Sequence, residues 1–433
     1  MATFKQGGND FPAIGILPGK AAPGRNWARN AMFAAVAIAL AACHSAGKQD
    51  KPDSSAAASV ETGRGEDASP GARAQAAGAL LDKSVALVQQ GKTEEARAIC
   101  DEIIRLYGED ASPAMREPVA TALFHKGWVL GSQGKAEEAI AIYDEVIRRH
   151  GEDASPGVRG QVAKANLNKG WTLMRQGKTT EAAAILDELV RRYGEDASPA
   201  AREAVAMAIF NKSEILMKQD KTGEATALLD EVVRRYGEDT LPAVRERVAM
   251  ALSGKGMTLV EKQSKAEEAI AAFDEIVRRY GEDDSPGVRE QVAKALFSKA
   301  WTLGSQGKAG EAIAIYDEVI LRHGEDASSG VRGQVAKANL NKGWSLMQQG
   351  KIAEAAAILD ELARRYGEDA SPAAREAVAM AIFNKSEILI KQDKTGEATT
   401  LLDEVVRRYG EDDSSGIRET VARARDRKAR LSR

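Results

Sequence analysis

The chain has 433 residues, and 61 Lys and Arg against 64 Asp and Glu give a formal net charge of −3. This near balance excludes a general electrostatic attraction to nucleic acid. Four histidines and two cysteines, Cys43 and Cys100, leave few groups for metal or thiol chemistry and make no disulfide framework. Aromatic residues are only 5%, while Ala, Glu, Lys, Leu and Arg dominate, so the composition predicts helices.

Residues 1–42 are typical of a signal peptide. Lys20, Arg25 and Arg29 precede twelve uncharged and mostly apolar residues, 31–42. A bilayer-spanning helix needs about 20 apolar residues, so this stretch is too short to span and fits the apolar core of an export signal. The alternative is an uncleaved anchor in which Cys43 is incidental.

The end of that stretch, Leu40-Ala41-Ala42-Cys43, resembles the lipobox of bacterial lipoproteins. The resemblance implies that Cys43 becomes an acylated N-terminus and anchors the chain in a membrane. In that family an aspartate after the cysteine favours the inner membrane; His44 here implies an outer-membrane lipoprotein facing the periplasm. Residues 43–66, rich in Ser, Ala, Gly, Lys and Asp, are expected to form the lipidated N-terminus and a flexible linker.

The rest of the chain is organised by a repeat that ends in Gly-Glu-Asp. Its spacing is 43 residues, except for one step of 44. The glycines are Gly65, Gly108, Gly151, Gly194, Gly237, Gly281, Gly324, Gly367 and Gly410. A fixed period of this length predicts stacked supersecondary units, here eight repeats over residues 67–416.

Each repeat contains two helical stretches. In the third repeat, Ser155 and Pro156 are suited to the N-cap and first turn of a helix that continues to about Gln176. Gly177 breaks it, and a second helix is expected over 179–193, followed by Gly194 as a left-handed C-cap. Apolar residues at a spacing of three or four give the second helix one buried stripe: Ala182, Ile185, Leu186, Leu189 and Tyr193.

This pattern resembles the tetratricopeptide-repeat family, in which a small residue of the first helix packs against an alanine of the second across a glycine turn. Gly170, Gly177 and Ala182 occupy these places in the third repeat, as do Gly127, Gly134 and Ala139 in the second. The aromatic place of the family is filled by Tyr143, Leu186 and Tyr316 in three repeats. The resemblance implies an all-α helix-hairpin solenoid, although the period exceeds the usual 34 residues of the family.

The resemblance also implies a concave groove that binds a protein or peptide partner. In the family, the residue after the small residue and the one four positions earlier often face that groove. The candidate groove residues are Phe124, Trp128, Trp171, Phe210, Glu214, Met257, Phe297, Trp301, Trp344, Phe383 and Glu387. The alternative is that the lengthened first helix buries the tryptophans between repeats.

One lysine recurs in every repeat: Lys83, Lys126, Lys169, Lys212, Lys255, Lys299, Lys342 and Lys385. An Asp-Glu pair follows 18 residues later, or 19 in the repeat with the insertion. We hypothesise a ladder of lysine–carboxylate contacts between helices that sets the stacking register, the alternative being solvated side chains.

The remaining polar residues give no sign of catalysis. Glu282-Asp283-Asp284 and Glu411-Asp412-Asp413 cluster acids without the spacing of an EF-hand, so a charge-paired edge is expected there rather than a calcium site. Cys100 falls on the buried stripe of the first repeat and is expected to be a core residue. We therefore expect no enzyme, no cofactor and no metal.

Residues 417–433 carry seven Lys or Arg and two Asp or Glu, and they are expected to form a capping helix. Contact with anionic lipid or an envelope polymer is the alternative. Residues 154–239 and 327–412 differ at 8 of 86 positions, which indicates a block duplication.

Together these features favour a non-enzymatic scaffold or adaptor lipoprotein that binds a protein or peptide partner in the cell envelope. The alternatives are a structural spacer without a specific ligand and an envelope-assembly accessory that contacts cell-wall polymer.

Overall fold

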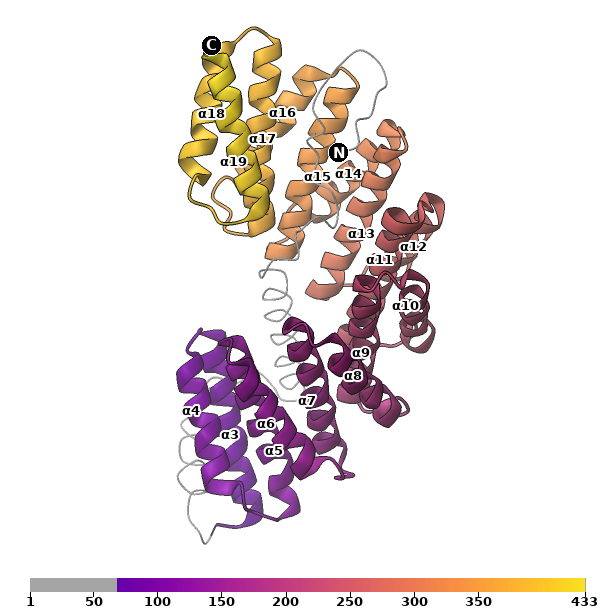
Figure 1. Ribbon diagram of the computed structural model, residues 1–433, viewed down its shortest axis with the longest axis vertical. Helices are drawn as coiled ribbons and strands as arrows, with labels where there is room; N and C mark the ends of the chain where they lie inside the picture. Colours follow the sequence, from indigo (N-terminus) through magenta and orange to yellow (C-terminus); the bar gives the residue numbers. More distant parts are fainter. Residues whose placement is uncertain (1–67, 433) are drawn as a thin grey trace. The chain divides into compact units, whose positions relative to one another are not determined.

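The computed structural model describes residues 68–432; of residues 262 and 263 only the backbone is described. This part of the chain contains 17 α-helices and no strand (Figure 1). The first helices of the repeats are α3 (Pro70–Gln89), α5 (Pro113–Ser132), α7 (Pro156–Arg175), α9 (Pro199–Lys218), α11 (Pro242–Gln263), α13 (Pro286–Ser305), α15 (Ser329–Gln348) and α17 (Pro372–Lys391). The expected all-α solenoid of eight hairpins and a final helix is confirmed.

The second helices, all of 15 residues, complete the hairpins. They are α4 (Thr93–Tyr107), α6 (Ala136–His150), α8 (Thr179–Tyr193), α10 (Thr222–Tyr236), α12 (Ala266–Tyr280), α14 (Ala309–His323), α16 (Ile352–Tyr366) and α18 (Thr395–Tyr409). The final helix, α19, spans Ser415–Leu431.

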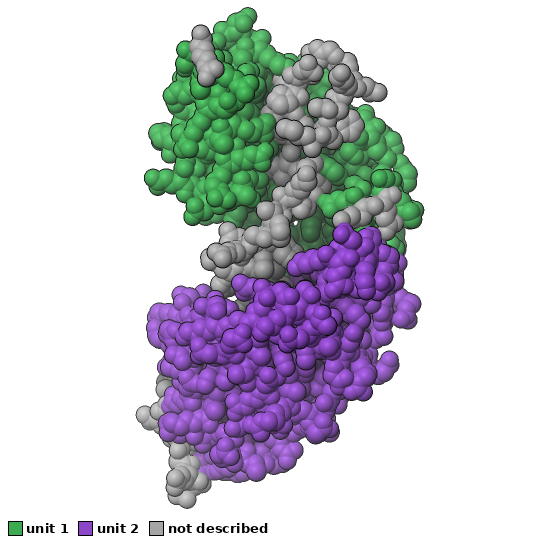
Figure 2. All heavy atoms as spheres, viewed as in Figure 1, with its two compact units in different colours: residues 1–27, 252–433 green, residues 28–251 purple. Residues whose placement is uncertain are grey.

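The described residues fall into two compact units, which meet in sequence between residues 251 and 252 (Figure 2). Within each unit the stacking rule is the same. A first helix packs on the second helix of its own repeat and on the first helix of the next repeat, as α7 does on α8 and α9. The first helices therefore form a continuous row in each unit, and the second helices form another.

The helices begin and end where local chemistry requires it. The carboxylate of Asp153 accepts a hydrogen bond from the backbone N–H of Ser155 at 2.8 Å, which fixes the turn before Pro156 begins α7. Between the two helices Gly177 has a φ of +78°, a left-handed conformation that suits glycine. The predicted break at this glycine is confirmed.

The prediction for Gly194 is wrong. This residue follows α8 with φ −59° and ψ −29°, which is right-handed and open to any residue. Glycine is needed there for space, since a Cβ atom would lie 2.6 Å from the carbonyl oxygen of Val190. The Gly-Glu-Asp motif thus allows a close approach at the helix end rather than a left-handed cap.

Small residues let the two helices of a repeat touch. A Cβ at Gly127 would lie 2.7 Å from the ring of Tyr143, and one at Gly170 would lie 2.9 Å from Leu186. In the first repeat Ser84 holds this place and lies 3.4 Å from the sulfur of Cys100, which is fully buried. The prediction that Cys100 is a core residue is confirmed; its burial raises the pKa of the thiol to about 11.

The lysine ladder is present, but its partners differ from those we expected. Lys169 on α7 contacts Asp144 of α6 at 2.6 Å, so its partner lies 25 residues earlier, in the preceding repeat, and is not the aspartate that follows 18 residues later. The same relation joins Lys126–Asp101, Lys212–Asp187, Lys299–Asp274, Lys342–Asp317, Lys385–Asp360 and Lys428–Asp403. The ladder therefore joins successive repeats.

A second set of ion pairs lies at the junctions. Arg159 at the start of α7 contacts Asp196 of the following Gly-Glu-Asp at 2.7 Å. The pairs Arg73–Asp110, Arg116–Asp153, Arg202–Asp239, Arg289–Asp326, Arg332–Asp369 and Arg375–Asp412 repeat this contact. Arg192 also contacts the Gly151 carbonyl and the Glu152 carboxylate of the preceding motif. The expected charge-paired edge is confirmed for these junctions.

Candidate functional site

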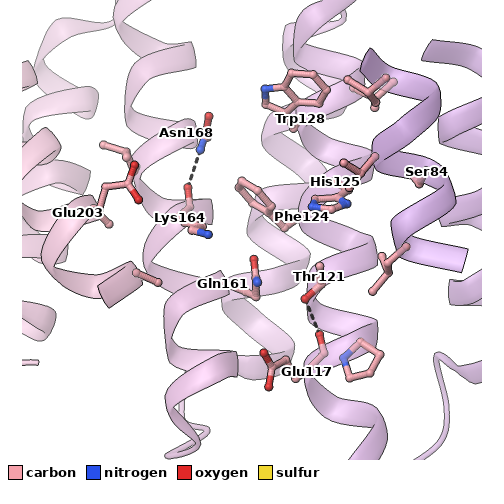
Figure 3. Close-up of a pocket in the computed structure, with 18 of the residues that line it drawn as sticks. Ser84, Glu117, Thr121, Phe124, His125, Trp128, Gln161, Lys164, Asn168 and Glu203 are labelled. Atoms are coloured by element: carbon pink, nitrogen blue, oxygen red, sulfur yellow. Dashed lines mark hydrogen bonds between the residues drawn. The ribbon is translucent and has the colours of Figure 1, made fainter. Parts of the chain in front are cut away.

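A cavity of about 630 Å³ opens among the first helices of the unit that ends at residue 251. Four consecutive first helices, α3, α5, α7 and α9, supply its walls, and Arg247 of α11 also lines it. The cavity exists because these helices stack side by side and each presents the same face. Figure 3 shows Phe124, His125 and Trp128 on one helix, across from Gln161, Lys164 and Asn168 on the next.

Three of the candidate groove residues line this cavity: Phe124, Trp128 and Trp171. Trp128 is almost enclosed, with 4% of its surface exposed, whereas Phe124 and Trp171 are half-buried. The guanidinium of Arg175 lies 4.9 Å from the ring centre of Trp171, one helical turn along α7. The face that the family resemblance implied therefore does border a hollow at these three positions.

The other candidates do not line the cavity. Phe210, Phe297 and Phe383 are buried and belong to the helix packing; the ring of Phe297 lies 5.9 Å from that of Tyr316. Glu214, Met257, Trp301 and Trp344 are half-buried. Glu387 is buried and paired with Arg427 of α19. Neither alternative holds for the whole set, because one tryptophan is buried and three are partly open.

Several cavity residues were not anticipated from the sequence, among them His125, Gln161, Lys164 and Asn168. Lys164, Asn168 and Trp171 follow one another at helical spacings of four and three, so they share one face of α7. That spacing from Trp171 was the signal that could have identified the first two. The amide nitrogen of Asn168 donates to the carbonyl of Lys164 at 2.9 Å, which holds the side chain along the helix.

The electrostatics of the cavity keep its histidine neutral. Burial of His125, with a smaller effect of the nearby Lys164 ammonium, lowers the imidazole pKa to about 4. Asp82, Glu117 and Glu203 are the carboxylates on the lining. Glu117 lies against the start of α7, where a Cβ on Gly157 would collide with its carboxyl group. Its charge thereby faces the positive end of a helix dipole.

Three buried polar atoms on the lining have no hydrogen-bond partner among the described residues. They are the indole nitrogen of Trp128, the amide oxygen of Gln161 and Nε of Arg247. The guanidinium of Arg247 does contact Glu246 through Nη1, at 3.3 Å. Most buried polar groups in proteins are paired, so these atoms mark a place where a ligand could supply the missing partners.

Two further properties concern residues 68–432, metal ligation and membrane insertion. No three His, Cys, Asp or Glu side chains with described positions come together as a metal-binding group would require. Within the same range, none of the helices combines the length and the apolar character needed to cross a bilayer. Cys43 and the apolar stretch before it lie outside the described residues.

Comparison with known structures shows the fold. The structure of apo RapI matches with a TM-score of 0.54 at 11% identity, covering 90% of this chain and 98% of RapI. The apo quorum sensor NprR from B. thuringiensis matches at 0.46 and 12% identity, covering 77% and 88%. A tetratricopeptide repeat protein from Parabacteroides merdae matches at 0.41 and 16%, covering 71% and 99%. No curated protein sequence matches the chain.

Family models agree with this fold. A model described as tetratricopeptide repeat matches overlapping segments that together run from residue 124 to 413, and a second model of the same description matches residues 77–102. Together these matches cover well over half of the sequence and follow the hairpins of the structure. The chain therefore belongs to the tetratricopeptide-repeat family.

Proposed function

We propose that the protein is a non-enzymatic scaffold that holds a protein or peptide partner along its first helices while a lipid on Cys43 ties it to a membrane. Tetratricopeptide-repeat proteins generally mediate protein–protein interactions, and their scaffold is typically non-catalytic. The observation that carries the proposal is the cavity between α3, α5, α7 and α9, where Phe124, Trp128 and Trp171 of the candidate groove meet.

The chemistry of this cavity suits recognition rather than catalysis. Aromatic rings offer a large apolar contact, and tryptophan adds one hydrogen-bond donor. Ser84 also lines the cavity, but its hydroxyl donates to the carbonyl of Ala96 within its own hairpin. The partner is therefore held by burial and hydrogen bonds.

The membrane anchor rests on the sequence alone. The apolar stretch 31–42 and the lipobox-like Leu40–Cys43 support removal of residues 1–42 and acylation of Cys43. Several acyl chains would anchor the chain firmly, because each buried CH₂ contributes about 0.8 kcal/mol. We place the protein at the outer membrane, facing the periplasm, with residues 43–66 as the tether.

Two experiments test the two halves of the proposal. Cys43→Ser should move the protein from the membrane to the soluble fraction, and unchanged membrane association would contradict the anchor.

Affinity capture from envelope extract should lose its partners when Phe124 and Trp171 are changed to alanine, with circular dichroism confirming that the helices remain. The matched control is Trp344→Ala, the counterpart of Trp171 in the duplicated block, which should retain them.

A structural spacer is the second candidate. It is favoured by the ion pairs that recur at one junction after another, such as Lys169–Asp144 and Arg159–Asp196, because they stiffen the stack without reference to any ligand. Equal partner lists for the native chain and the Phe124/Trp171 variant would favour the spacer.

A further inference from the structure

The cavity of the unit that ends at residue 251 carries more acidic than basic charge. Its lining includes three carboxylates on three different first helices, and none of them has an ion pair among the described residues: Asp82 on α3, Glu117 on α5 and Glu203 on α9. Figure 3 shows Glu117, Lys164 and Glu203 on three successive helices. Acidic groups around a recess with apolar walls raise the local concentration of cations, because the low-dielectric walls focus the field.

The basic groups of the described lining balance only part of this charge. Lys164 on α7 supplies one ammonium, and Arg247 on α11 already contacts Glu246 at 3.3 Å. His125 adds no charge at neutral pH, since burial lowers the pKa of its imidazole to about 4. Three carboxylates against one unbalanced ammonium leave a net charge of −2 on the lining.

The unit that begins at residue 252 provides an internal comparison, because its first helices repeat the same positions. Five places differ in charge between the two units: the first has Asp82, Glu117, Thr121, Lys164 and Glu203, and the second has Gly254, Glu290, Lys294, Lys337 and Glu376. The second set contains two carboxylates and two ammonium groups, so its net charge is zero. The acidic excess is therefore a property of the first unit and not of the repeat in general.

Aromatic and aliphatic side chains form the remaining walls of the cavity. Phe124, Trp128 and Trp171 contribute rings, while Leu167 and Met207 contribute aliphatic chains. An aromatic face attracts a cation through the ring quadrupole, and contact with the aliphatic chains removes apolar surface from water. The occupant that matches both the charge and the walls is a cation with an apolar body.

We propose that this cavity binds a small organic amine, which carries one ammonium group on an aliphatic or aromatic body. The ammonium lies on the side of Asp82 and Glu117, away from Lys164, and the body packs against Phe124 and Trp128. An anion of the same size would meet Lys164 as its only unbalanced counter-charge and would be repelled by the three carboxylates. The cavity volume of about 630 Å³ lies within the range of small-molecule sites.

This inference shares its cavity with the proposed function but does not depend on a protein partner. A bound amine would occupy the place where Phe124 and Trp128 face the hollow, so it would compete with a partner for these rings. Titration with amines and affinity capture are separate measurements. Either proposal can therefore fail while the other stands.

The first test compares three probes that have the same chain and differ in charge: octylamine, octanol and octanoate. Titration calorimetry with the full chain should give octylamine an affinity about tenfold above that of octanol, and octanoate should bind more weakly still. Added salt should narrow the difference, because Asp82 and Glu117 are exposed and their charges are screened.

Charge variants of the lining test the sign of the preference. Lys164→Met should raise the affinity for octylamine and Thr121→Lys should lower it, each by about threefold to tenfold. Both new side chains already stand at the same place of other repeats, in Met207 on α9 and Lys294 on α13, so the helix accepts them. The matched control Lys294→Thr in the second unit should leave the affinity within about twofold, since distant sites act independently.

The contrary outcomes are distinct. Octanol or octanoate binding as tightly as octylamine would overturn the preference for a cation, and so would a weaker octylamine affinity in Lys164→Met. A lack of binding by all three probes would remove the site altogether. A capped peptide with one central lysine that binds as tightly as octylamine would assign the cavity to a protein side chain instead of a free amine. Circular dichroism of each variant establishes that the helices remain.

Discussion

Arg427 on α19 donates two hydrogen bonds to the carboxylate of Glu387 on α17, from Nε to Oε1 at 2.7 Å and from Nη2 to Oε2 at 3.1 Å. Glu387 is only 6% exposed, so its charge depends on this partner. One turn earlier, the guanidinium of Arg423 lies 5.1 Å from the ring centre of Phe383. Two arginines on one face of α19 thus hold the final helix on the last repeat.

We expect Arg427→Gln to loosen this helix. The change leaves the Glu387 carboxylate buried without a cation, and the loss should be about 1–3 kcal/mol, because hydrogen bonds to charged groups contribute on this scale and the arginine is itself partly exposed. Hydrogen exchange of the α19 amides should report it, since terminal elements of a repeat stack open first. Adding Glu387→Gln should restore part of the protection, because the unpaired charge is then gone.

The control for this experiment lies on the same helix. Arg430 contacts Asp426 at 2.9 Å, but both side chains are more than 60% exposed. Arg430→Gln should therefore change the protection of α19 by less than about 0.5 kcal/mol. Equal effects of Arg427→Gln and Arg430→Gln would show that the buried pair does not hold the helix.

The lysine ladder should act collectively. Single exposed pairs contribute about 0–1 kcal/mol, so Lys169→Met alone should change little, while the triple change of Lys169, Lys212 and Lys342 to Met should lower the melting temperature and reduce its dependence on salt. Lys83→Met is the matched control, since Lys83 belongs to the first repeat and no described helix precedes it. A triple variant with native melting and native salt dependence would mean that these contacts do not set the register.

The helices could be predicted from the sequence because each boundary has its own local signal. Three local signals mark the third repeat: Ser-Pro at the start, a glycine turn in the middle and an apolar stripe at a spacing of three or four. They predict its second helix at 179–193, where the structure has it. The error at Gly194 arose because glycine can serve two purposes, a left-handed backbone or a missing Cβ. Only the neighbouring carbonyl of Val190 distinguishes them.

The contacts between repeats were harder to predict. Periodicity shows which face of a helix is covered but not which helix covers it, so Lys169 was matched to the wrong aspartate. Phe124 on α5 and Phe210 on α9 occupy the same place in two repeats that are separated by one other. Phe124 lines the cavity, whereas Phe210 is buried in the helix packing. Gln161 lies three residues before Lys164 and continues the same face of α7, but its enclosure by its neighbours carried no signal in the sequence.

Two glycine-to-alanine changes should have opposite effects on stability. Gly127→Ala places a Cβ 2.7 Å from the ring of Tyr143 in a closed helix contact, and overpacking of this kind should lower the free energy of unfolding by about 1–3 kcal/mol. Gly310→Ala on α14 meets nothing within 4 Å and should raise it by up to about 1 kcal/mol through helix propensity. Denaturant unfolding of both variants provides the measurement, and a neutral Gly127→Ala would contradict the close packing.

The neutral His125 should make the protein less stable in mild acid. Its pKa in the folded chain is lowered to about 4, against 6.5 for an ordinary histidine, so between these values the unfolded chain binds more protons than the folded one. The contribution of His125 is therefore fully present above pH 6.5 and is lost as the pH falls from 6.5 toward 4. Burial also lowers the pKa of His150 and His323, which adds loss in the same direction.

His125→Asn separates its share from theirs. Asparagine stands at the corresponding place in the next two repeats, as Asn168 and Asn211, so it is compatible with this helix. The free energy of unfolding of the variant, measured by denaturant between pH 4 and 7.5, should fall less steeply below pH 6.5 than that of the native chain. Parallel curves for the two proteins would mean that His125 titrates normally in the folded state and that the cavity around it admits water.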